Sequence, residues 1–149
     1  MATINVTVRA VHPNPSQDRR KFAAVLTVTN RLTNQKEVED IPELGASFDL
    51  EIDARYNFRA DPRDDNFGIG SRNIKILSST NTVNVRVAPM GEECRIWLED
   101  IKGLMAKGQH KKARQQIGLA KRVYKGLADP PKETADIFES ILKLEKDLP

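Results

Sequence analysis

One change in the spacing of apolar residues, close to Glu92, constrains the fold of this chain more than any other feature. Before it, apolar residues alternate with polar ones, which is typical of strands that bury one face. After it, they recur every three or four residues, which is typical of amphipathic helices. The sequence therefore predicts an α+β fold, with an N-terminal antiparallel β-sandwich over residues 1–89 and a C-terminal three-helix segment over residues 90–149.

Several alternating stretches predict the strands of the sandwich. They run over Thr3–Val11 and Phe22–Thr29, from Phe48 to Phe58, and around residues 74–76 and 83–87. The stretch from Phe48 to Phe58 is the longest and predicts one continuous strand, whose outer face begins with an acidic ladder of Asp49, Glu51 and Asp53. Residues 30–40 are expected to form a turn or a short edge hairpin, and residues 60–72 the longest loop.

Charged, glycine and proline residues predict where the three helices begin and end. Glu92 and Glu93 put negative charge at the start of the first helix, where the helix dipole favours it. Gly108, Gln109 and His110 are the expected turn into a second helix. Asp129 followed by Pro130 predicts the N-cap and the first residue of the third helix.

The first two helices carry charge of one sign. Every charged residue from Ile101 to Leu127 is basic, and most of those on the second helix fall opposite its apolar stripe. We call the following set the basic face: Lys107, Lys111, Lys112, Arg114, Lys121, Arg122 and Lys125. We expect it to bind a protein partner or a second copy of the chain, for which the acidic ladder is one complement.

A nucleic acid is the alternative partner of the basic face, because lysine and arginine neutralise phosphates of any sequence. Single-strand binding also needs aromatic side chains on which bases stack. Tyr124 is the one aromatic residue among these basic residues, and it belongs to the apolar stripe. The sequence therefore favours a protein partner over a nucleic acid.

Residues 94–127 share their spacing with a known helical repeat. The matching positions are Trp97, Ile101, Leu104, Gly108, Ala113, Ile117 and Ala120, with His110 where the repeat has a tyrosine in its turn. The segment resembles one tetratricopeptide-like repeat, a helix–turn–helix unit that binds proteins, although Asp100 stands at a usually apolar position and no second copy follows. An ordinary helical pair is the alternative. Such units bury their faces by stacking, so the sandwich, the third helix or another subunit must cover the apolar side.

Catalytic and metal-binding patterns are absent from the sequence. His12, His110 and Cys94 have no serine, cysteine or carboxylate at a spacing that indicates a catalytic triad. We therefore expect a non-enzymatic protein without cofactor, metal or small-molecule substrate. The cluster from Asp61 to Asn66 offers oxygen ligands for calcium, but the neighbouring arginines favour a plain turn.

Cysteine content and hydropathy bear on the compartment. Cys94 is the single cysteine, so no disulfide can form within the chain, and neither a signal sequence nor a long apolar run appears. We therefore expect a cytoplasmic module that does not enter a membrane and that serves as a domain of a larger protein or complex.

Overall fold

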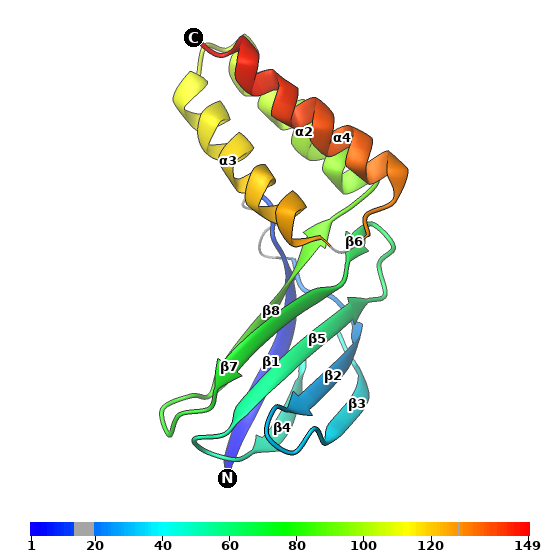
Figure 1. The fold of residues 1–149 in the computed structure, drawn as a ribbon, viewed down its shortest axis with the longest axis vertical. Coiled ribbons are helices and arrows are strands. Elements are labelled where there is room, and N and C mark those ends of the chain that lie inside the picture. Colours follow the sequence, from blue (N-terminus) through cyan, green and yellow to red (C-terminus); the bar gives the residue numbers. More distant parts are fainter. Residues whose placement is uncertain (14–19, 128) are drawn as a thin grey trace.

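The computed structural model describes residues 1–13, 20–127 and 129–149, and it confirms the predicted α+β fold. Over these residues, two four-stranded sheets are followed by three α-helices (Figure 1). The strands are β1 (Ala2–Ala10), β2 (Ala24–Asn30), β3 (Lys36–Ile41), β4 (Ala46–Leu50), β5 (Arg55–Pro62), β6 (Phe67–Gly68), β7 (Gly70–Lys75) and β8 (Thr82–Pro89). The helices are α2 (Glu92–Ala106), α3 (His110–Gly126) and α4 (Lys132–Leu144), and a 3₁₀ turn, η1 (Glu145–Asp147), follows them.

The two sheets enclose one apolar core. The strand order is β4-β1-β8-β6 in one sheet and β3-β2-β5-β7 in the other. Neighbouring strands pair antiparallel except β1 and β8, which are parallel. Alternate residues point inward, so that Ile4, Leu26 and Val85 have no exposed surface. The sandwich is therefore antiparallel, as predicted, around one parallel pair at its centre.

The predicted continuous strand from Phe48 to Phe58 is wrong. The chain leaves one sheet after β4, turns over residues 51–54, and enters the other sheet as β5. Asp53 takes a left-handed conformation with φ of 71°, which aspartate tolerates better than most residues, and its N–H donates to the Ile76 carbonyl at 2.6 Å. Apolar and polar residues continue to alternate through the turn, but Ile52, which the alternation predicts to face inward, is exposed. Glu51 and Asp53 lie in the turn, so the acidic ladder does not exist as predicted.

The predicted long loop over residues 60–72 is also wrong, while the edge hairpin is confirmed. β5 continues to Pro62 and β7 begins at Gly70, which leaves a short turn in which the Asp64 side chain accepts a hydrogen bond from the Asn66 N–H at 2.9 Å. Gly70 allows close approach to β8, since a Cβ there would lie 2.0 Å from the Arg86 carbonyl oxygen. Residues 30–40 form the end of β2, a turn and the edge strand β3.

The helices begin close to the predicted residues, except for α4. α2 starts at Glu92, as expected, and α3 starts at His110, which was predicted to be the last residue of the turn. α4 starts at Lys132 with Pro131 at its N-cap, and Asp129 has φ of 46° and does not cap it. The second proline explains the shift, because the residue before a proline avoids the helical conformation, and Pro130 therefore cannot be the first helical residue.

The helices bury their apolar stripes against one another, in a core separate from that of the sandwich. Trp97 of α2, Ile117 of α3 and Phe138 of α4 have no exposed surface. α4 is thus the element that covers the apolar side of the α2–α3 hairpin.

A small charged junction joins the two parts of the molecule. The Arg20 guanidinium contacts the Asp64 carboxylate at 2.5 Å and the Glu93 carboxylate at 3.2 Å. Asp64 belongs to the sandwich and Glu93 to the first turn of α2, so one arginine connects both. His12 also crosses the junction, with its ring centroid 5.5 Å from that of Trp97.

Candidate interaction surface

α3 buries one stripe of small and apolar residues and exposes the rest of its circumference. Ala113, Ile117 and Ala120 have no exposed surface and recur at helical spacing. All seven side chains of the basic face are exposed, on α3 or, for Lys107, at the end of α2. The fold thus exposes all seven predicted residues to solvent, six of them on α3 and Lys107 just before it.

Most of the basic face has no anionic partner within the described residues. The Lys121 ammonium contacts the Glu145 carboxylate at 2.5 Å, and the Arg114 guanidinium donates to a Pro149 oxygen at 2.5 Å. No ion pair involves the other five side chains in the described part of the chain: Lys107, Lys111, Lys112, Arg122 and Lys125. Their charges are available to another molecule.

The start of α3 departs from the usual charge preference of helices. The first turn of α2 carries Glu92 and Glu93, and that of α4 carries Glu133, all favourable at the positive end of a helix dipole. The first turn of α3 holds Lys111 and Lys112, no acidic residue and no capping side chain. Each charge at such a position costs about 0.3–1 kcal/mol. Positions that depart from the charge preference of a helix, as Lys111 and Lys112 do, are expected to serve a function instead of stability.

Neither large aromatic side chain of the hairpin is available to stack on a base. The Trp97 ring is fully buried. The Tyr124 ring lies parallel to that of Phe138, at an interplanar angle of 3° and a centroid distance of 5.1 Å. Both rings thus belong to the helical core, as the sequence predicts.

An acidic surface lies elsewhere than predicted. Glu37 and Glu39 project from the edge strand β3, close enough to Asp49 of β4 that the charges interact. Desolvation is the main cause that raises the pKa of Glu37. A hydrogen bond with Glu39, repulsion from Glu39 and repulsion from Asp49 raise this pKa further. We call Glu37, Glu39 and Asp49 the acidic edge. The sequence signal for it is Glu-Val-Glu in an edge hairpin, but the proximity of this hairpin to Asp49 depends on how the two sheets pack.

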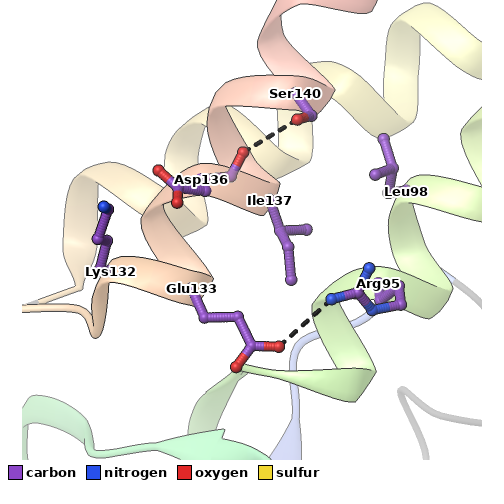
Figure 2. Close-up of a pocket in the computed structure, with 7 residues that line it drawn as sticks. All are labelled: Arg95, Leu98, Lys132, Glu133, Asp136, Ile137 and Ser140. Carbon is purple, nitrogen blue, oxygen red and sulfur yellow. Dashed lines mark hydrogen bonds and ion pairs between the residues drawn. The ribbon is translucent and has the colours of Figure 1, made fainter.

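Two hollows lie beside the helices, and neither has the features of a catalytic site. Figure 2 shows a groove of about 490 Å³ between α2 and α4, across which Arg95 is paired with Glu133 at 3.3 Å. A larger cleft of about 710 Å³ separates the end of α3 from the sandwich. Charged side chains of both signs line this cleft, with Arg59, Arg86 and Arg122 among them.

The residues considered for chemistry are engaged in packing. Burial, with a smaller effect of the Glu93 charge, raises the pKa of the Cys94 thiol to about 12, and the thiol donates to the Pro89 carbonyl at 2.8 Å. His12 is buried against Trp97. Asp64 is paired with Arg20, and the described residues contain no group of three metal-binding side chains suited to an ion. None of the described helices is long and apolar enough to cross a membrane.

Comparison with known proteins yields a distant likeness in structure alone. No protein-family model matches the chain, and no curated protein matches it. The shaft pilin SpaA from Lactobacillus rhamnosus GG matches with a TM-score of 0.37 and 11% identity, covering 60% of this chain and 47% of the pilin chain. Its E269A/D295N double mutant matches with a TM-score of 0.37, 12% identity and the same coverage. The match spans about half the length of the pilin chain, and a likeness this weak assigns neither family nor function.

Proposed function

We propose that the chain is a non-enzymatic assembly module that associates with other protein surfaces, including copies of itself, through the basic face. The observation that carries this proposal is the group of five exposed cationic side chains without an anionic partner in the described residues: four lie on α3, which contains no acidic residue, and Lys107 follows the end of α2. The resemblance of residues 94–127 to one tetratricopeptide-like repeat supports it, because that repeat binds proteins. We further propose a cytoplasmic location, where a single cysteine stays reduced.

The expected partner surface is acidic, and the contact is expected to be weak. An exposed ion pair contributes about 0–1 kcal/mol, so charge would set orientation and encounter rate more than affinity. Salt at 1 M reduces the screening length to about 3 Å and would therefore weaken such a contact.

Light scattering over a range of protein concentrations tests this proposal, at low and at high salt. We expect a mass above that of the monomer at low salt, falling towards the monomer mass at high salt, with no change when a generic nucleic acid is added. A monomer at every concentration that gains mass only with nucleic acid would overturn the proposal. An oligomer that ignores salt would support assembly through apolar contact and remove the basic face from it.

The second candidate function is that of a nucleic-acid-binding accessory protein. It is favoured by the exposed charges on α3, which would neutralise phosphates: Lys111, Lys112, Arg114, Lys121, Arg122 and Lys125. A salt-sensitive mobility shift with arbitrary DNA or RNA, lost when these residues are replaced by glutamate, would favour this function. The burial of Trp97 and the stacking of the half-buried Tyr124 ring on Phe138 argue against base stacking.

A further inference from the structure

β3 is an edge strand with one side free. It pairs with β2 alone among the described strands, and every residue from Lys36 to Asp40 is exposed. Glu37 and Glu39 lie opposite the buried residues Val28 and Leu26 of β2, so their side chains project on the core side of the sheet and still reach solvent. The strand thus presents two carboxylates at the margin of the sandwich.

The acidic edge lacks a cationic partner in the described residues. Neither Glu37 nor Glu39 forms an ion pair there, and Asp49 accepts a hydrogen bond from the Thr3 hydroxyl at 2.8 Å. Desolvation is the largest cause of the raised pKa of Glu37, and a hydrogen bond with Glu39 and repulsion from Glu39 and Asp49 add to it. A cationic partner would relieve this repulsion.

The two complementary surfaces cannot meet within one molecule. In Figure 1 the helices occupy the upper end of the molecule, and the sandwich extends away from them, with β3 and β4 in its lower part. The basic face on α3 and the acidic edge are therefore separated by the length of the sandwich. The acidic edge can therefore reach the basic face only when it belongs to a second copy.

We propose that the acidic edge of one copy binds the basic face of α3 in a second copy. This inference rests on the proposed function and names its partner. The contact joins two different surfaces, so each copy offers one acidic and one basic site. Lysines have the length and flexibility to reach carboxylates along a strand edge, and the contact blocks the free side of β3 without requiring a new strand.

A charge-reversal experiment with mixing tests this pairing. Lys111→Glu with Lys112→Glu is one variant, and Glu37→Lys with Glu39→Lys is the other. Each variant alone is expected to associate at least about tenfold more weakly than the wild type, because attraction becomes repulsion at one surface. An equimolar mixture of the two is expected to recover association, because each supplies the surface that remains complementary in the other. The reversal on α3 also places glutamates where the helix dipole favours them, so it should not impair folding.

Matched controls separate this effect from a change in net charge. Lys75→Glu with Lys132→Glu, and Glu139→Lys with Asp147→Lys, alter exposed residues outside both surfaces by the same charge. These controls are expected to associate like the wild type. Glutamine at the four tested positions provides a second, milder pair of variants if a reversal fails to fold.

Three results would overturn the pairing. The first is association of the wild type that persists in both reversal variants, which would leave the assembly module standing with another contact. The second is loss in both variants without recovery on mixing. The third is increased aggregation of the β3 variant, which would mean that its glutamates serve to keep the edge strand from pairing. A wild type that stays monomeric throughout would refute the self-association in the proposed function, on which the pairing rests.

Discussion

Replacing Phe138 should destabilise the helices while leaving the stability of the sandwich unchanged. Phe138 of α4 has no exposed surface and contacts an aromatic ring on each of the other two helices. The Trp97 ring lies edge-on at 5.9 Å and the Tyr124 ring is stacked at 5.1 Å. The side chain thus connects all three helices within a core that is separate from that of the sandwich.

The expected cost follows from these contacts. Phe138→Ala removes a buried phenylalanine, which costs about 3–5 kcal/mol. Phe138→Leu keeps most of the apolar burial and loses two aromatic pairs, each contributing about 0.5–1.5 kcal/mol, for a total of about 1–3 kcal/mol. A helical part of about 60 residues has a free energy of unfolding of only about 3–9 kcal/mol at typical values per residue. The alanine variant should therefore lose most of the stability of its helices.

Two probes separate the helices from the sandwich. Trp97 is the only tryptophan, so its fluorescence during urea titration reports on the helical core and on the contact of Trp97 with His12 at the junction. Amide hydrogen exchange of β1 and β2 reports on the sandwich. We expect the fluorescence midpoint to fall in the order wild type, Leu variant, Ala variant, while exchange in the strands stays slow. Equal acceleration of exchange in strands and helices would show that the two cores unfold as one unit.

Three further predictions concern single positions. Glu93→Gln should have a melting temperature at pH 7 equal to or above that of the wild type. Desolvation raises the pKa of Glu93 above 4.5, so the folded state binds more protons than the unfolded state. The stability of the wild type should therefore fall as the pH rises from about 4.5. Melting curves from pH 4 to 7 test this, and a variant whose relative stability drops with pH would contradict it. Cys94 should resist iodoacetamide until urea unfolds α2, whereas rapid labelling of the native protein would show the thiol to be accessible. Gly45→Ala should destabilise the protein by about 1–2 kcal/mol or more, since φ is 92° and the new Cβ would lie 2.3 Å from the Val6 carbonyl oxygen. Gly103→Ala in α2, where a Cβ meets nothing, should stabilise the protein by about 0.5–1 kcal/mol. Urea titration of the two variants measures both changes.

Local patterns were sufficient for most of the fold. The period of apolar residues distinguishes strands from helices because burial of one face imposes it, and Glu92 and Gly108 mark helix boundaries through charge and conformational freedom. Phe48, Leu50, Tyr56 and Phe58 all point inward as expected, although they belong to two strands. Polarity alone does not reveal that a chain changes sheets between two inward-facing residues.

Long-range proximity is what the sequence could not supply for the candidate surface. The basic face was predictable because six of its residues are neighbours on one helix and Lys107 lies in the turn before it. The acidic edge was not, because Glu37 and Asp49 belong to edge strands of different sheets. The ion pairs of Arg20 with Asp64 and Glu93 depend equally on the packing of distant segments.

Zero-length cross-linking tests the pairing of the basic face with the acidic edge most directly. A carbodiimide joins a lysine amine to a carboxylate in contact with it, and an equimolar mixture of isotope-labelled and unlabelled chains identifies links between copies by mass spectrometry. We predict links between copies from Lys111 or Lys112 to Glu37 or Glu39, formed at low salt and lost at high salt. Links between copies that consistently avoid these residues would contradict the account.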